Sequence, residues 1–148
     1  MNTNVTINLD QVRELGTFHA EREAAQDLDA VMGTLCANPK YLYPTLGKGF
    51  SGRKNAERFY RWFFKNFSSK VVDGQLIRQW INETSVSQEY DVVVKMHGKL
   101  EIHRILGVLF IEGDKLGGEI VYASEQTIQR MLGPMFSELV VMDKPYGI

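Results

Sequence analysis

The spacing of apolar residues divides the chain into a helical first half and a β-rich second half. In the first half, apolar residues recur every three or four positions in three segments, which is the period of an amphipathic helix. Asn, Asp, Ser or Gly stands at each start, and most of these residues favour a helix N-terminus. The three predicted helices begin after Asn8 or Asp10, at Asp27 (running through Leu35 and ending before Pro39) and at Ser51-Gly52-Arg53.

After Asp73-Gly74 the period changes to two, which indicates strands. The clearest alternation runs over 86–96, and further strands are predicted over 76–81, 102–111 and 119–123, the last two joined by a turn at 112–115. Ser124 is expected to cap a last short helix that ends at Gly133-Pro134. Helices followed by strands predict an α+β fold with a mostly antiparallel sheet.

Composition narrows the class of protein. The 148 residues are 44% hydrophobic and 24% charged, which is typical of a single globular domain. We expect one domain over 1–148, with a core at about 10–132 and a tail at 134–148 that docks on the body or on a second subunit. The formal net charge of −1 provides no basic field for a phosphate backbone, so no nucleic-acid partner is expected.

The cysteine, histidine and glycine patterns predict neither a metal nor a cofactor. The single Cys36 has no intrachain disulfide partner, which suits a reducing cytoplasm. The three histidines show no metal-ligand spacing, and Gly47-Lys48-Gly49 lacks the features of a phosphate loop. No apolar run has the length of a membrane span and Met1–Asn4 has no signal pattern, so we expect a cytoplasmic protein that binds no membrane.

Three motifs carry a resemblance to a known family: Asp27-Leu28-Asp29, Tyr41-Leu42-Tyr43-Pro44 and the segment from Gly52-Arg53 to Phe59-Tyr60. Their order and spacing resemble the ketosteroid-isomerase and SnoaL-like branch of the nuclear transport factor 2-like superfamily, over about residues 10–132. The resemblance implies a cone-shaped, cystatin-like fold, in which a curved sheet wraps on N-terminal helices. It also implies a pocket for a small hydrophobic molecule between the helices and the sheet.

The resemblance does not extend to the isomerase chemistry. Where steroid isomerases carry a catalytic carboxylate before a proline, this chain has Tyr43, and His19 stands where they carry a donor tyrosine. The position of their donor aspartate falls at Leu106, and a supporting tyrosine is matched by Tyr60. A phenol with a pKa of about 10 is a poor base at neutral pH, and a leucine donates no hydrogen bond. We therefore expect no steroid isomerase activity.

A different carboxylate is a candidate base. The segment Glu119–Tyr122 resembles one that many SnoaL-like proteins carry, and alternation places Glu119 and Val121 on the face that lines the pocket in the isomerases. An apolar surround would raise the pKa of Glu119 into a useful range. If Leu106 and Val108 face the pocket, Arg104 does so too and His103 points away, unless a bulge reverses the strand.

The sequence therefore supports two hypotheses. The first is a cofactor-free acid–base enzyme of the SnoaL-like kind (a cyclase, isomerase, dehydratase or hydrolase) acting on a largely apolar metabolite, with His19 or Glu119 moving the proton and Tyr43 orienting the ligand. The second is a non-catalytic module that binds a ligand or a protein. The expected ligand-binding residues are Tyr60, Trp80, Arg104, Leu106, Val108 and Val121. Either hypothesis includes a homodimer through a sheet face that carries Ile105, Leu109 and Ile111.

Overall fold

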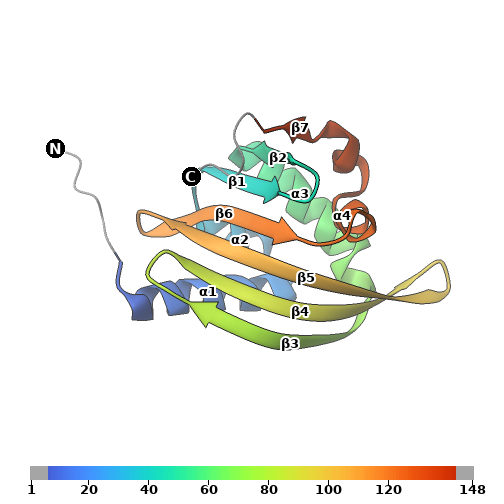
Figure 1. Ribbon diagram of the computed structural model, residues 1–148, viewed down its shortest axis with the longest axis horizontal. Coiled ribbons are helices and arrows are strands. Elements are labelled where there is room, and N and C mark those ends of the chain that lie inside the picture. Colours follow the sequence, from blue (N-terminus) through green and yellow to red (C-terminus); the bar gives the residue numbers. More distant parts are fainter. Residues whose placement is uncertain (1–6, 143–148) are drawn as a thin grey trace.

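The computed structural model describes residues 7–142, and helices α1 to α3 lie on one side of a curved sheet (Figure 1). The elements in chain order are α1 (Leu9–Ala24), α2 (Leu28–Gly33), β1 (Leu35–Tyr43), β2 (Lys48–Ser51), α3 (Arg53–Asn66), the 3-10 helix η1 (Ser68–Lys70), β3 (Val71–Ile81), β4 (Ser85–Met96), β5 (Lys99–Glu112), β6 (Lys115–Tyr122), α4 (Glu125–Leu132), the 3-10 helix η2 (Gly133–Glu138) and β7 (Val140–Val141). No helix within this part of the chain is both long enough and apolar enough to cross a membrane.

The strands form one mixed sheet. Within residues 7–142 the strand order is β3-β4-β5-β6-β1-β2-β7, and every neighbouring pair is antiparallel except β1 and β6, which are parallel. The predicted α+β class with a mostly antiparallel sheet is confirmed. Because strands β3 to β6 are long and curve over the helices, they leave room for a cavity between the two layers.

Side-chain caps start three of the helices. The side chain of Asn8 accepts a hydrogen bond from the backbone N–H of Gln11, and the side chain of Gln11 accepts one from the backbone N–H of Asn8, which forms a capping box. Asp27 and Ser124 cap α2 and α4 in the same way, through the N–H groups of the residues three positions later. These starts agree with the sequence prediction.

The second helix ends earlier than its apolar spacing predicts. Helix α2 stops at Gly33, and Leu35, expected in the helix, begins β1. Leu35 lies opposite Leu116 of β6, and the backbone N–H of Leu116 donates to the carbonyl of Thr34 at 2.8 Å. Pairing with a strand far along the chain therefore overrides the local helical period.

An aromatic cluster joins α3 to β1 and β2. Phe59, Tyr60 and Phe63 of α3 are buried, and they pack toward Tyr41 and Phe50, whose rings stack with centroids 4.8 Å apart. Aromatic rings of this size supply a large share of the buried apolar area. The cluster holds β1 against the third helix, and one of its members, Phe63, lines the cavity.

The register of β4 against β5 corrects the predicted orientation of β5. Val92 lies directly opposite His103, and directly opposite residues of an antiparallel pair share a face. Because Val92 lines the cavity, His103 points inward. Arg104, Leu106 and Val108 therefore lie on the outer face of the sheet, and their predicted inward orientation is wrong.

The cause of this error is that both faces of β5 are apolar. The inner face carries a histidine and Gly107, so it looks less apolar than the outer face when hydrophobicity alone is compared. The predicted dimer face is wrong for the same reason. Ile105 and Leu109 are buried, and Ile111 packs partly against the core.

The predicted tail is described as far as residue 142, and 143–148 lie outside the described residues. Helix η2 follows α4 directly, and β7 pairs with β2 through Val141 opposite Lys48. Glu138 of η2 forms an ion pair with Arg58 of α3 at 3.0 Å. Residues 134–142 therefore dock on the body of the same chain.

A close approach between β1 and β6 places the strand that carries Glu119. Gly118 lies opposite Lys40 with a φ of +136°, and a Cβ at this position would overlap the carbonyl oxygen of Lys40. Only glycine adopts this φ readily, and only glycine lets the two backbones come so close. The next residue, Glu119, consequently lies opposite Tyr41.

We predict that Gly118→Ala lowers the free energy of unfolding by about 3 kcal/mol or more, because it adds backbone strain to a backbone clash. Gly33→Ala is the matched control, since its Cβ would have no neighbour within 4 Å. The control is expected to change stability by less than about 1 kcal/mol. Urea denaturation measures both variants, and equal stability of Gly118→Ala and the parent would contradict the role given to this crossing.

Candidate active site

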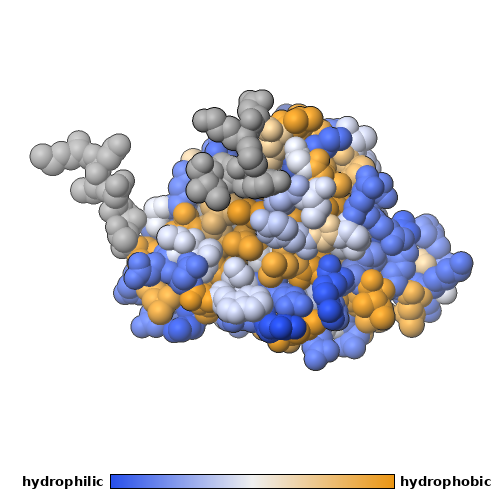
Figure 2. All heavy atoms as spheres, viewed as in Figure 1, coloured by the Kyte–Doolittle hydropathy of each residue, from blue (hydrophilic) through white to orange (hydrophobic). Residues whose placement is uncertain are grey.

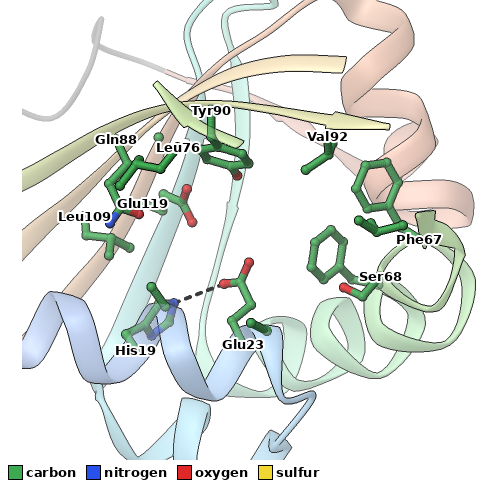
Figure 3. A pocket seen from close by; sticks show the side chains of 15 residues that line it. His19, Glu23, Phe67, Ser68, Leu76, Gln88, Tyr90, Val92, Leu109 and Glu119 are labelled. Carbon is green, nitrogen blue, oxygen red and sulfur yellow. Dashed lines mark ion pairs between the residues drawn. The ribbon is translucent and has the colours of Figure 1, made fainter. Parts of the chain in front are cut away.

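A cavity of about 500 Å³ lies between α1, the end of α3 and strands β3 to β6 (Figure 3). Its volume falls in the range of small-molecule pockets. Most of its wall is apolar, and the larger apolar side chains that line it are Phe63, Phe67, Val71, Leu76, Val92 and Leu109. Such a wall favours a ligand with an apolar body.

The polar side chains of the cavity come from four elements. They are His19 and Glu23 of α1, Ser68 of η1, Gln88 and Tyr90 of β4, and Glu119 of β6. In Figure 3 the carboxyl groups of Glu23 and Glu119 and the hydroxyl of Tyr90 point into the same space from different sides. In the part of the chain that the structure describes, no lysine or arginine lines the cavity.

The side chain of Glu119 is half-buried, and no lysine or arginine of residues 7–142 lines the cavity beside it. The pKa of its carboxyl is raised to about 8, mainly by burial and to a smaller extent by the negative charge of Glu23. The part of its side chain that protein does not cover faces the cavity. Within residues 7–142 no side chain or backbone group forms a hydrogen bond with this carboxyl, so both oxygens are available to a ligand.

Gly107 makes the space for this carboxyl. A Cβ at position 107 would collide with Oε1 of Glu119. The glycine on β5 therefore lets the glutamate side chain lie across the neighbouring strand, at the inner surface of the sheet.

The imidazole of His19 is held in one tautomer. The Thr34 hydroxyl donates to the carbonyl oxygen of Val31 at 2.6 Å, so its lone hydrogen is used. The 2.7 Å bond between Thr34 Oγ1 and His19 Nδ1 must then be donated by the histidine. This leaves Nε2 facing the Glu23 carboxyl at 3.3 Å and the Tyr60 hydroxyl at 3.3 Å.

His19 and Glu23 form one polar pair at the cavity wall. A protonated imidazole donates from Nε2 to the Glu23 carboxylate, whereas a neutral imidazole accepts at Nε2 from the Tyr60 hydroxyl. Both arrangements fit the distances, so this imidazole is placed for proton transfer at the cavity wall.

Tyr90 supplies a hydroxyl opposite these acids. Burial mainly, and the charges of Glu119 and Glu23 in addition, hold the pKa of its phenol well above the ordinary value. Tyr90 is therefore a neutral hydrogen-bond donor at neutral pH. It lies on the same strand face as Gln88, whose side-chain amide donates to Gln79 at 2.7 Å.

Comparison with known proteins identifies the fold. No protein-family model matches the chain, and no curated protein matches it by sequence. Among solved structures, the chain is similar to an NTF2-like protein from Anabaena variabilis, with 19% identity, a TM-score of 0.63, and 84% of this chain and 93% of that chain covered. The chain has the nuclear transport factor 2-like fold.

Two further structures show the same likeness. An NTF2-like protein of unknown function from Cytophaga hutchinsonii is 13% identical with a TM-score of 0.64, and 76% of this chain and 99% of that chain are covered. A protein with a cystatin-like fold from Silicibacter pomeroyi is 15% identical with a TM-score of 0.60, with 89% of each chain covered. At these identities the likeness concerns the fold alone.

The nuclear transport factor 2-like fold brings two of the three predicted catalytic residues to the cavity. His19 and Glu119 both line it. Tyr43 does not, because its ring is buried in the aromatic cluster beside Phe50. Burial, and to a smaller extent the charge of Glu119, raises the pKa of the Tyr43 phenol, so this group lies near the site without reaching its surface.

The predicted ligand-binding residues divide into two groups. Tyr60 lies behind the cavity wall, where its hydroxyl links His19 to the hydroxyl of Tyr41 at 2.8 Å, and Val121 is buried without lining the cavity. The other four residues lie outside the cavity. They are Trp80, Arg104, Leu106 and Val108.

These four belong to the outer face of the sheet. Trp80 is 53% exposed and stands opposite Ser87 of β4. The guanidinium of Arg104 forms two hydrogen bonds of 2.8 Å with the carboxylate of Asp91, which holds the pKa of that carboxylate below its usual range. Neither residue can reach a ligand in the cavity.

The inward-facing His103 belongs to a separate buried cluster. Its Nδ1 lies 2.7 Å from the hydroxyl of Thr127, and its Nε2 lies 3.1 Å from Glu101, which in turn pairs with Arg130. Every polar atom of this imidazole has a partner, so the cluster anchors α4 to β5. No group of three His, Cys, Asp or Glu side chains in the described part of the chain is arranged to hold a metal ion.

Sequence reasoning missed Glu23, Gln88 and Tyr90. Glu23 follows His19 by four positions, which places both on one face of α1. Gln88 and Tyr90 alternate with polar residues on the strand face that the sequence correctly assigns to the inside. Both periodic signals were present, but neither distinguishes a cavity from a packed core.

We predict that Thr34→Val releases the tautomer of His19. The imidazole loses the acceptor for its Nδ1 proton, so the nitrogen shifts of His19 should move toward a mixture of tautomers, and stability should fall by about 1 to 2 kcal/mol. Nitrogen-15 NMR of the ring detects this change. The control is Thr17→Val, at an exposed position of α1, the helix that carries His19. Unchanged ring shifts in Thr34→Val would contradict the assignment.

We also predict a pH-dependent stability that Glu119→Gln removes. With a pKa raised from 4.5 to about 8, Glu119 holds in the folded state a proton that the unfolded chain releases. Its contribution is complete below about pH 4.5 and is lost as the pH rises toward 8. Relative to Glu119→Gln, the wild type should lose on the order of 4 kcal/mol between pH 4 and pH 9. Urea denaturation across this range tests it, and parallel profiles would contradict it.

Proposed function

We propose that the cavity is the active site of a cofactor-free acid–base enzyme of the SnoaL-like type, which acts on a largely apolar metabolite. The observation that carries the proposal is the Glu119 carboxyl, which faces the cavity with its pKa raised to about 8. A group that titrates near the working pH is present in useful amounts both as acid and as base. The proposal also includes a single domain over 1–148 whose tail docks on the body, and a cytoplasmic location. The lone Cys36 is compatible with that location.

The surrounding groups have distinct parts in this chemistry. Glu119 donates a proton to a ligand oxygen or nitrogen, or removes a proton from a carbon, depending on its state. The neutral Tyr90 donates a hydrogen bond to the charge that develops on the ligand. The His19 and Glu23 pair exchanges a second proton on the side facing α1. The apolar walls exclude bulk water, which strengthens each of these interactions.

Ketosteroid isomerisation is not part of the proposal. The phenol of Tyr43 has no access to the cavity, and Leu106 lies on the outer face. The acid–base groups of this chain come from α1, β4 and β6 instead. The proposed reaction therefore depends on acid–base groups at other positions than those of the steroid isomerases.

We predict that the protein catalyses exchange of carbon-bound hydrogen with solvent deuterium in some members of a panel of apolar ketones and β-hydroxy ketones. Mass spectrometry measures the incorporation. Glu119→Gln should slow it by about 100-fold or more, which is the usual contribution of a positioned acid or base. Glu21→Gln, an exposed glutamate on the outer side of α1, should leave the rate unchanged.

The panel also has an outcome that rejects the enzyme. If compounds bind in the cavity but none exchanges faster than in buffer, or if Glu119→Gln exchanges as fast as the wild type, Glu119 is not the acid–base group. The cavity would then serve ligand binding alone, which is the second hypothesis drawn from the sequence.

We propose in addition that the protein is a homodimer through its outer sheet face. This face is defined by apolar side chains on β3, β5 and β6, namely Trp80, Leu100, Ile102, Leu106, Val108 and Tyr122. Ile102 is 73% exposed and Trp80 53% exposed. Figure 2 shows apolar side chains among charged ones on the face of the molecule viewed there. Exposed apolar patches of this kind commonly mark protein interfaces.

Light scattering at micromolar concentration should give the mass of two chains for the wild type. Leu106→Lys should give the mass of one chain, because it places a charge in the centre of the outer sheet face. Val141→Lys, at an exposed position of β7, should remain dimeric. A monomeric wild type would contradict the proposal.

A further inference from the structure

The distribution of charge in the cavity restricts the ligand more than its apolar walls do. Two carboxyl groups, of Glu23 and Glu119, face one space of about 500 Å³, and no lysine or arginine within residues 7–142 lines it. The Glu23 carboxylate already has a partner in His19, whose Nε2 lies 3.3 Å away. Glu119 has no such partner, and no hydrogen bond reaches it from the residues that the structure describes. Its half-buried carboxyl is therefore a polar group that faces the cavity without a protein partner among the described residues.

A carboxyl that faces a largely apolar cavity with no cation beside it favours a ligand that brings a positive charge. Charged groups rarely lie in apolar surroundings unless a partner of opposite charge accompanies them. The groups that face Glu119 are Glu23 and His19 from α1 and the Tyr90 hydroxyl from β4. Tyr90 is neutral, and the imidazole of His19 lies against the Glu23 carboxyl, at 3.3 Å. None of them balances the charge that Glu119 takes when it ionises.

We propose that the natural ligand of this cavity is an apolar molecule that carries a basic nitrogen, and that its positive charge converts Glu119 from the acid form to the carboxylate. The inference rests on the active site proposed above and specifies its ligand class. Without a cation in the cavity, most of the Glu119 carboxyl is protonated at neutral pH, and only a minor fraction is available as a base. Binding of an ammonium group releases that proton to solvent and leaves a carboxylate beside the bound cation.

The alternatives meet less complementary surroundings. A ligand carboxylate would face two acidic groups and no cation, which is the least favourable combination. An uncharged alcohol or ketone would accept a hydrogen bond from protonated Glu119 without changing its charge. The rings of Phe63, Phe67 and Tyr90 favour the cation further, since aromatic faces attract ammonium groups.

A matched series of ligands separates these possibilities. Octylamine, octanol and octanoate share one apolar chain and differ at the polar end, and octylamine is fully protonated at pH 7. Isothermal titration calorimetry of the full-length protein at pH 7 should give octylamine a Kd at least about tenfold lower than that of octanol, with octanoate weakest. In buffers of different ionisation enthalpy, octylamine should release close to one proton and octanol none.

Variants assign the effect to Glu119. Glu119→Gln should lose both the preference for octylamine over octanol and the proton release, while it still binds octanol. Glu21→Gln should behave as the wild type. Because Glu119→Gln retains the shape of the side chain, binding of octanol also reports that the variant cavity is intact.

Four results would overturn the proposal: octanol or octanoate binding as tightly as octylamine, no proton release with octylamine, an amine preference that survives in Glu119→Gln, or no binding of any of the three by the folded wild type. These outcomes are separate from those of the exchange assay. Hydrogen exchange without an amine preference would support the proposed enzyme function with a neutral substrate and would reject the proposed amine ligand. An amine preference without exchange would leave a binding protein for apolar amines.

Discussion

The burial of the Glu119 carboxyl in a cavity that offers it no cation is the constraint around which the site is organised. A carboxylate in such surroundings would lose most of its hydration, so the group keeps its proton at neutral pH. The folded chain tolerates this because the protonated form needs no counterion. Ionising Glu119 in the folded protein costs free energy, and this cost lowers stability only as the pH rises. A ligand that offsets the same cost would change the protonation state of Glu119.

The position of that carboxyl depends on how β6 pairs with its two neighbouring strands. β6 is antiparallel to β5 on one side and parallel to β1 on the other, and Gly118 allows the close approach to Lys40. Gly107 then clears the space into which the Glu119 side chain extends. Two glycines on neighbouring strands therefore place one acid, and the second acid comes from α1 across the cavity. The aromatic cluster behind them packs β1 against α3.

Most of the architecture could be predicted from the sequence, because it depends on local signals. Asn8 and Ser124 are recognisable caps, and the alternation over β4 identifies its inner face. The orientation of β5 could not be predicted in this way. Both of its faces are apolar, and only the pairing of Val92 with His103, which joins residues eleven positions apart in sequence, decides between them.

The site was partly predictable for a related reason. His19 and Glu119 carry titratable groups at positions that the family resemblance points to, and both reach the cavity. Tyr43 fulfils the same pattern but packs into the core, because its neighbour Phe50 and the rings of α3 leave it no path to the cavity. Glu23 and Tyr90 follow from the geometry of the cavity, which requires the three-dimensional placement of α1 against β4.

The central claim is that Glu119 is protonated in the empty cavity at neutral pH. The most direct measurement is carbon-13 NMR of the glutamate carboxyl groups across a pH titration, with Glu119→Gln used to assign the signal. The account predicts a midpoint near 8 for Glu119, well separated from the exposed glutamates. A midpoint near the ordinary value of 4.5 would contradict it, since the carboxyl would then be ionised and solvated at neutral pH.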